Sequence, residues 1–103
     1  MKCFANPATA YKYDRLGFRQ SGIFLRLRIG NVTVDAVEHP KGVRLTFEMI
    51  TTRSMSQYEA FLPENCSLEQ IAGLIYANIA KNNRDNSAIC RAHFEALGLP
   101  LFQ

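Results

Sequence analysis

Long apolar runs and clustered cysteines are both missing from this 103-residue sequence. No stretch approaches the roughly 20 apolar residues that a membrane-spanning helix needs, so we expect no membrane association. The first residues include no apolar h-region, which argues against a secretory signal. The three cysteines are an odd number at wide spacing, which predicts reduced thiols in a cytoplasmic protein rather than a disulfide framework.

Motifs that commit a chain to a reaction or a cofactor are missing as well. Gly17, Gly22 and Gly30 do not form a glycine-rich phosphate loop. The carboxylates are dispersed along the chain, and nothing in the sequence pairs two of them for acid–base hydrolysis. We therefore expect a non-enzymatic protein with no cofactor and no metal. A small enzyme whose pocket the sequence does not reveal is an open alternative.

The overall composition is that of a folded chain. Hydrophobic residues make up 48 % and charged residues 20 %, an ordinary balance for a globular protein. A chain of this length should bury roughly two-thirds of the surface that its unfolded form exposes. We predict one α+β domain over residues 1–103.

Basic side chains are concentrated in the first third of the chain. The net charge is only +3, but residues 1–30 hold six bases against the single acid Asp14. Aromatic residues alternate with bases in YKYDRLGFR, residues 11–19, as they do in proteins that stack single-stranded nucleic acid. An anion- or nucleic-acid-binding module is therefore an alternative function, with nucleic acid less favoured because the net charge is small. Its candidate residues are Lys12, Arg15, Arg19, Arg26 and Arg28.

The clearest structural signal is a hairpin in LRLRIGNVTVDAV, residues 25–37. Aliphatic residues occupy alternate positions on both sides of Gly30-Asn31, a pair that accepts the positive φ of a two-residue turn. That turn places Arg26 opposite Asp35 and Arg28 opposite a threonine, on a face where they keep the sheet solvated. The residues predicted to share the opposite, dry face are Ile23, Leu25, Leu27, Ile29, Val32, Val34 and Ala36.

Further strands are predicted on both sides of this hairpin. His39-Pro40-Lys41-Gly42 has the composition of a turn, and the alternation over residues 43–49 then predicts a third strand that places Glu48 opposite Thr33. The segment QYEAFL, residues 57–62, fits either a fourth strand or a helical turn, and we favour the strand. The segment AYKYD, residues 10–14, is a candidate edge strand with Tyr11 and Tyr13 on one face.

Two helices are predicted at the C-terminal end. Ser67 and Gln70 have the spacing of a capping box, and apolar residues follow at helical spacing up to Ile79. A shorter helix is predicted from about residue 87 to residue 97. The sequence thus indicates an α+β protein, an antiparallel β-meander of three to five strands with two C-terminal helices packed on one face.

The second predicted helix carries Cys90 and His93 three positions apart, so that they share a helix face. A thiolate beside an imidazole is found in zinc sites and in cysteine nucleophiles. Both residues lie on an apolar stripe, however, and the other cysteines are scattered singletons. We expect a buried cysteine and a hydrogen-bonded histidine rather than a metal or catalytic site.

Small residues on the first predicted helix form a strip of Gly73, Ala77 and Ala80, with Leu74 beside it. This strip is core if the second helix covers it, and a homodimer interface if the second helix packs beside the first. The tail LPLF, residues 99–102, resembles the hydrophobic end of the peptides that dock bacterial replication proteins on the sliding clamp, with Gly98 where those peptides open with glutamine. The candidate interface residues are Gly73, Leu74, Ala77, Ala80, Leu101 and Phe102.

The leading functional hypothesis is a small, homodimeric, non-enzymatic binding protein. Its partner is a protein or a small molecule that the sequence does not identify. In size and in its lack of motifs the chain resembles orphan accessory proteins of mobile elements and gene cassettes.

Overall fold

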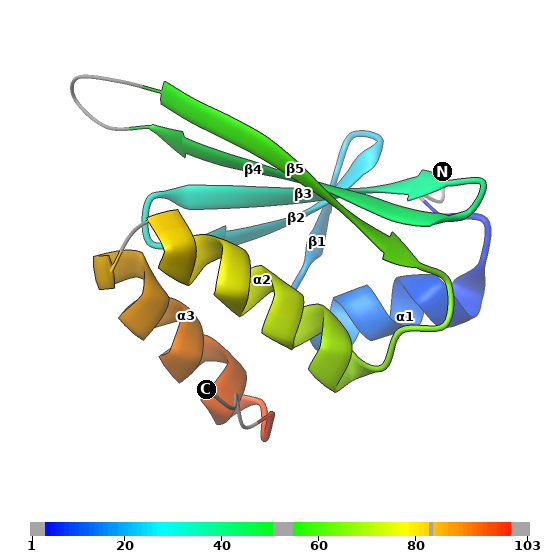
Figure 1. Ribbon diagram of the computed structural model, residues 1–103. Coiled ribbons are helices and arrows are strands. Elements are labelled where there is room, and N and C mark those ends of the chain that lie inside the picture. The colour runs from blue at the N-terminus through cyan, green and yellow to red at the C-terminus, as the bar shows by residue number, and fades with distance from the viewer. Residues whose placement is uncertain (1–3, 51–54, 83, 100–103) are drawn as a thin grey trace.

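The computed structural model, shown in Figure 1, describes residues 4–50, 55–82 and 84–99, and its centre is a five-stranded antiparallel sheet. The strands follow one another across the sheet in chain order, so the sheet is a meander. In the described part of the chain one helix precedes the sheet and two follow it, so the predicted α+β fold class is confirmed. The elements in chain order are α1 (Pro7–Arg15), β1 (Arg19–Ser21), β2 (Phe24–Ile29), β3 (Val32–His39), β4 (Gly42–Ile50), β5 (Met55–Pro63), α2 (Leu68–Asn82) and α3 (Arg84–Ala96).

The registers predicted from the turns are confirmed. Gly30, with φ of 59°, makes the turn between β2 and β3. Arg26 on β2 lies opposite Asp35 on β3, as predicted. Between β3 and β4, Thr33 lies opposite Glu48, also as predicted. The prediction for Ile23 is wrong: it lies in the turn between β1 and β2 and is 61 % exposed. A residue in a tight turn has no neighbouring strand to bury it, so the alternation of β2 does not extend to it.

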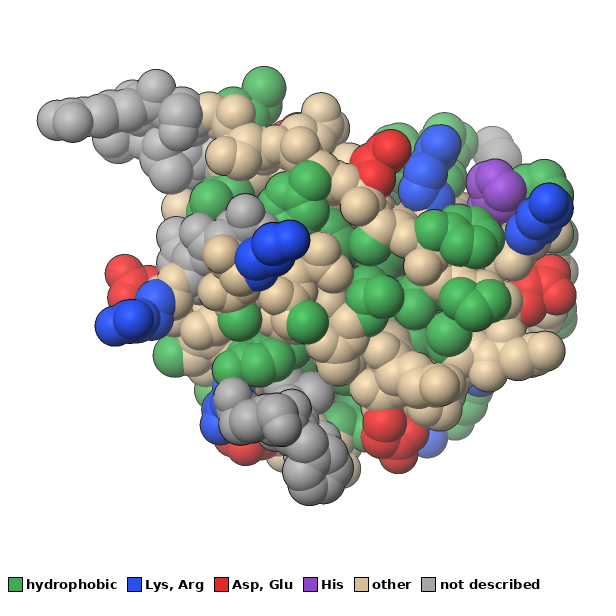
Figure 2. Space-filling view, in the orientation of Figure 1, with side chains coloured by type: hydrophobic (Ala, Val, Ile, Leu, Met, Phe, Trp, Pro, Cys, Tyr) green, Lys and Arg blue, Asp and Glu red, His purple; other side chains and the backbone are tan. Residues whose placement is uncertain are grey.

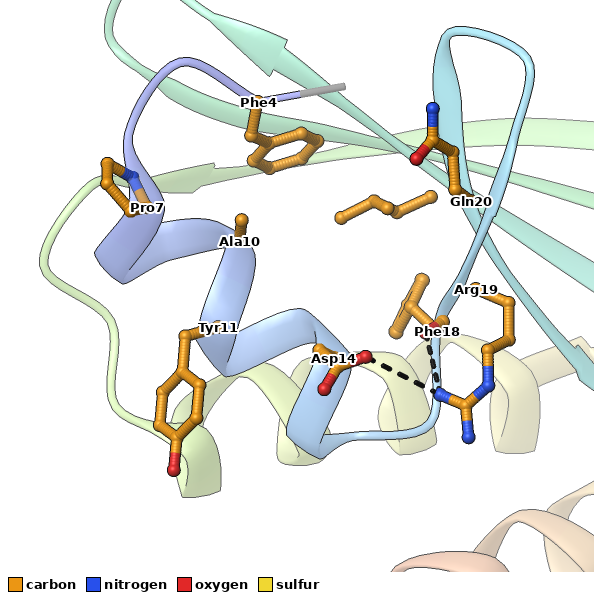
Figure 3. Close-up of a pocket in the computed structure, with 9 residues that line it drawn as sticks. Phe4, Pro7, Ala10, Tyr11, Asp14, Phe18, Arg19 and Gln20 are labelled. Carbon is orange, nitrogen blue, oxygen red and sulfur yellow. Dashed lines mark hydrogen bonds and ion pairs between the residues drawn. The ribbon is translucent and has the colours of Figure 1, made fainter. Parts of the chain in front are cut away.

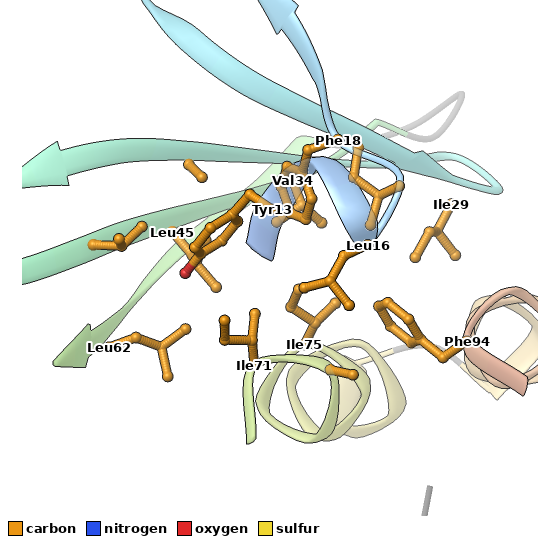
Figure 4. Packing of buried hydrophobic residues seen from close by; sticks show 14 of the residues in the cluster. Tyr13, Leu16, Phe18, Ile29, Val34, Leu45, Leu62, Ile71, Ile75 and Phe94 are labelled. Carbon is orange, nitrogen blue, oxygen red and sulfur yellow. The ribbon is translucent and has the colours of Figure 1, made fainter. Parts of the chain in front are cut away.

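The three helices lie on the same side of the sheet, and the hydrophobic core fills the space between them and the strands (Figures 1 and 4). Strand residues at alternate positions point into this space, and Val34, Leu45 and Phe47 are all 0 % exposed. Ile75 on α2 and Phe94 on α3 are also 0 % exposed and close the core from the other side. The opposite face of the sheet is not covered by any element of the described chain, and we call it the open face.

The first helix corrects the prediction of an edge strand at residues 10–14. Asn6 caps α1 by accepting a hydrogen bond from the Ala8 amide at 3.0 Å, and Pro7 occupies the first helical turn. Both are strong signals for a helix start. The edge strand is instead β1, which begins five residues after this segment. Tyr11 and Tyr13 do not share a face as predicted, because Tyr13 is buried and Tyr11 is exposed.

The C-terminal helices follow the prediction, with an earlier start for the second. The capping box forms as expected, because the Gln70 amide donates to Ser67 Oγ and the Ser67 amide donates to Gln70 Oε1. Helix α3 begins at Arg84 rather than near residue 87, so α2 and α3 are almost continuous in sequence. The strand favoured for residues 57–62 is confirmed within β5. Within the described residues, no helix combines the length and the apolarity needed to cross a bilayer.

Candidate ligand-binding site

A cavity of about 390 Å³ lies between α1 and the β1 edge of the sheet, and we call it the α1–β1 pocket. Its floor is apolar and includes Phe4, Phe18 and Leu25, whereas Asp14 and Arg19 stand at its rim. Figure 3 shows the side chains of Phe4, Ala10, Phe18 and Gln20 around the open space. The volume falls within the range of small-molecule sites, which combine apolar walls with a few polar groups. The complete lining is Phe4, Pro7, Ala10, Tyr11, Asp14, Phe18, Arg19, Gln20 and Leu25.

The turn from α1 into β1 positions Phe18 in this pocket. The Phe18 amide donates to the Tyr13 carbonyl, and the Gly17 amide donates to the Asp14 carbonyl. These two bonds define a Schellman motif, in which Gly17 adopts a φ of 102° that few other residues tolerate. The hydrophobic contact that accompanies such a motif is present too, since the Tyr13 and Phe18 rings meet edge to face at 5.2 Å. The helix end itself therefore builds one wall of the pocket.

Contacts distant in sequence hold α1 in place against the sheet. The Glu38 carboxylate on β3 accepts hydrogen bonds from the amides of Ala5 and Asn6, at 2.9 and 3.2 Å. At the other side of the helix, Lys12 Nζ donates to the Cys66 carbonyl at 2.9 Å. Because α1 is fastened at both places, the pocket is largely formed before any ligand arrives, which lowers the entropy cost of binding.

A cation stands at the pocket rim in a loose ion pair. Arg19 Nη1 lies 3.7 Å from Asp14 Oδ1 and donates to the Phe18 carbonyl at 3.0 Å. The two side chains of the ion pair are 75 % and 73 % exposed. Such a pair contributes little to stability, because water screens it. Arg19 can therefore exchange Asp14 for an incoming anion at small cost.

A second cavity, of about 350 Å³, adjoins the first at Arg19 and Gln20, which line both. Arg19, Arg26, Arg28 and His93 line this second cavity, which we call the arginine notch. The other residues of its lining are Gly17, Gln20, Ser21 and Leu27. Three of the five basic residues predicted to bind anions are thus brought together.

The three arginines of the notch differ in how strongly each is paired with a carboxylate of the protein. Arg26 is held by both oxygens of Asp35, at 2.7 and 3.0 Å, and this hydrogen-bonded carboxylate raises the pKa of the guanidinium. Arg28 is exposed and makes no ion pair with the described residues. The charge available to a ligand therefore comes from Arg28 and Arg19, whereas Arg26 is a fixed, neutralised support.

The other two predicted basic residues lie outside the notch. The hydrogen bond from Lys12 to the Cys66 carbonyl makes that residue part of the attachment of α1. Arg15 is exposed on α1, with its guanidinium 5.9 Å from the centre of the Tyr11 ring. The five residues therefore do not form one continuous basic surface.

On α3, Cys90 is buried as predicted, and His93 is half-buried and makes the predicted hydrogen bond. Cys90 is 0 % exposed, and His93 Nε2 lies 2.8 Å from the Leu16 carbonyl, so it donates a hydrogen bond there. This bond ties α3 to the turn after α1 and places His93 at the arginine notch. Within the described parts of the chain, no three His, Cys, Asp or Glu residues are grouped closely enough to hold a metal ion.

The buried thiol predicts a loss of stability at alkaline pH. Burial raises the pKa of Cys90 to about 12, whereas an unfolded cysteine titrates near pH 8.5. Above that pH the unfolded chain loses a proton that the folded chain keeps, so the free energy of unfolding should fall by about 1.4 kcal/mol per pH unit. Urea denaturation at pH 8 and pH 10 measures this fall, and Cys90→Ala should reduce it. Parallel pH profiles for the two proteins would contradict the assignment.

Helix α3 packs beside α2 rather than over its small-residue strip. Arg91 on α3 donates to the Tyr76 hydroxyl at 2.9 Å, along the flank of α2. Ala77 is exposed, Gly73, Leu74 and Ala80 are half-buried, and a Cβ added at Gly73 would meet nothing within 4 Å. The strip is therefore accessible to a partner. Leu101 and Phe102, the other predicted interface residues, lie outside the described residues.

Comparison with known proteins returns no relatives: no protein-family model matches the chain, and neither do any curated protein or solved structure.

Proposed function

We propose that this is a non-enzymatic binding protein for a small amphipathic anion. The apolar part of the ligand occupies the α1–β1 pocket, and its anionic group lies at the arginine notch. The two described cysteines, Cys66 and Cys90, are free and buried, which supports a reducing, cytoplasmic location.

The observation that carries this proposal is the position of Arg19. Arg19 lines both a largely apolar cavity of about 390 Å³ and a neighbouring cavity of about 350 Å³ whose lining includes two further arginines. An apolar ligand would gain nothing from this arrangement, and a simple inorganic anion would leave the apolar cavity unfilled. A ligand with a hydrophobic body and one negative group uses both parts.

The same arrangement disfavours a polynucleotide, the alternative suggested by the basic N-terminal third. A single strand needs a groove of cations and exposed rings that extends over several nucleotides. Here Lys12 is engaged with a carbonyl and Arg26 with Asp35, while Arg15 is separate from the notch. Binding to mixed single-stranded DNA and RNA at low salt, where phosphate contacts are strongest, distinguishes the two ligands.

A matched pair of fluorescent probes tests the proposal. Anilinonaphthalene sulfonate and phenylnaphthylamine share an apolar body, but only the first carries an anionic group. We expect saturable binding of both at one site per chain, with the sulfonate probe bound more tightly. Arg19→Gln should weaken the sulfonate probe about three- to tenfold, the effect of losing one exposed charge pair, and leave the neutral probe unchanged.

The control for this experiment is Lys41→Gln, which removes an exposed cation from the turn between β3 and β4, outside both cavities. It should alter neither affinity. Equal weakening by both variants would show that only the general positive charge matters, and an unchanged affinity in Arg19→Gln would contradict the proposed anion position.

A further inference from the structure

The edge strand β5 is long and almost uncharged. It covers nine residues, Met55–Pro63, and pairs with β4 alone, since the sheet order ends at β5. Glu59 is its single charged residue, and its proline stands at the last position. Exposed edges of this length are normally protected by lysines, bulges or an internal proline, because they otherwise pair with another chain. An edge without these devices fits a strand that has a partner.

The exposed apolar side chains of β5 lie at its two ends, on the open face. Met55 is 65 % exposed and Phe61 is 46 % exposed, and Gln57 and Glu59 stand between them on the same face.

Figure 2 shows the helix side of the molecule, where hydrophobic and uncharged side chains occupy the middle of the view and most charges lie at its rim.

We propose that β5 pairs with β5 of a second copy of this chain, antiparallel, about a two-fold axis at Tyr58. In that register Met55 faces Phe61 of the second copy, twice by symmetry, and Gln57 faces Glu59. A two-fold axis at Glu59 would instead place two carboxylates side by side, which is destabilising. An axis at Gln57, Ala60 or Phe61 would place Glu59 opposite an apolar residue. Among the registers that pair at least five residues, only the axis at Tyr58 places the Glu59 carboxylate opposite a polar, uncharged side chain, that of Gln57.

Helix α2 adds to this surface on the core side of the sheet. Tyr58 Oη donates to the Asn78 carbonyl at 3.1 Å, so α2 lies over β5 close to the proposed axis. The neighbouring Ala77 is exposed and Leu74 is half-buried. Two copies of α2 would therefore approach through small and apolar side chains, which permits close helix contact. The sequence-based interface residues Leu74 and Ala77 are included, with β5 as the main contact.

This inference is independent of the proposed ligand. The α1–β1 pocket is at β1, the opposite edge of the sheet from β5. A β5–β5 dimer therefore leaves both pockets open, at the two ends of a ten-stranded sheet, and the failure of either proposal does not affect the other.

Molecular mass in solution tests the dimer. Sedimentation equilibrium of the full chain should give twice the 11.6 kDa of one copy at micromolar concentrations. Met55→Glu places a carboxylate opposite Phe61 of the partner and should raise the dimer dissociation constant at least tenfold. The control is Ile23→Glu, which alters a residue that is 61 % exposed in the turn at the other edge. A monomer at all concentrations, or equal effects of the two variants, would overturn the proposal.

A crosslinking experiment tests the register. In a Cys3→Ser background, Met55→Cys protein mixed with Phe61→Cys protein should form a disulfide-linked heterodimer on mild oxidation, because facing residues of antiparallel strands are close enough for a disulfide. Met55→Cys mixed with Gln57→Cys lacks this facing pair and should not crosslink. A dimer by mass without the first crosslink would show that another surface associates.

Discussion

Replacing Phe47 by alanine should lower the free energy of unfolding by about 3–5 kcal/mol, the usual cost of removing a fully buried ring. Phe47 is 0 % exposed at the centre of the sheet, and its ring stacks on Tyr58 at 4.9 Å with an interplanar angle of 5°. No small movement of β4 can fill the resulting cavity, because strands lie on both sides. Urea denaturation followed by circular dichroism measures the change, and Phe47→Leu provides a milder variant should the alanine variant not fold.

The matched control is Phe61→Ala, which removes the same ring from the open face of β5. Phe61 is 46 % exposed and contacts His39 edge to face, so its loss should cost less than about 1 kcal/mol. Both substitutions are made in the Met55→Glu background, so that pairing at β5 does not contribute. Similar losses of stability for the two phenylalanines would contradict a sheet with one covered and one open face.

Ala10→Phe should weaken binding at the α1–β1 pocket about 100-fold, or about 2.7 kcal/mol, for both the sulfonate and the neutral probe. Ala10 lies on α1 and lines the cavity, so an aromatic ring at this position occupies the space that the apolar part of the ligand needs. The fold should survive, because the ring enters an existing cavity rather than a filled core. Fluorescence titration of both probes, with thermal unfolding as a check on folding, measures the effect.

The control is Ala8→Phe, the same substitution two residues earlier on α1. Ala8 is exposed and does not line the pocket, so both affinities should stay within about twofold of the parent protein. If Ala10→Phe binds both probes as tightly as Ala8→Phe, the ligand occupies another part of the surface, and the proposed function is wrong.

The meander was predictable from the sequence because each turn fixes its own register. Gly30-Asn31 permits one tight hairpin, and the period of two then assigns every side chain of β2 and β3 to a face. The His39–Gly42 turn extends the same logic to β4. These are local rules, so neighbouring residues were sufficient.

Helix α1 was mistaken for an edge strand because two tyrosines with one residue between them imitate a strand. The stronger signal was five residues upstream, where Asn6 and Pro7 cap the helix and begin it. An Asn–Pro pair of this kind marks a helix start more strongly than the spacing of two tyrosines marks a strand. Its attachment through Glu38 and Lys12 spans more than 30 residues, and no local pattern encodes such contacts.

In the candidate site, too, the features set by local sequence could be predicted, and those set by contacts distant in sequence could not. The sequence supplied Arg19, Arg26 and Arg28 as possible anion ligands, and alternation placed Arg26 and Arg28 on the same face of the predicted hairpin. The apolar pocket beside them could not be predicted, because it exists only once α1 is folded and docked against β1. His93 lies at the arginine notch because it is hydrogen-bonded to the carbonyl of Leu16, a residue 77 positions earlier in the chain. No local sequence pattern encodes such a contact.

The most direct test of the account is the location of the sulfonate probe on the protein, measured by nuclear magnetic resonance with isotope-labelled protein. We predict intermolecular nuclear Overhauser contacts from the naphthalene ring to Phe18 and Leu25, together with a shift of the Arg19 guanidinium resonance. Contacts confined to the open face of the sheet or to α2, with Arg19 unperturbed, would contradict the proposed site.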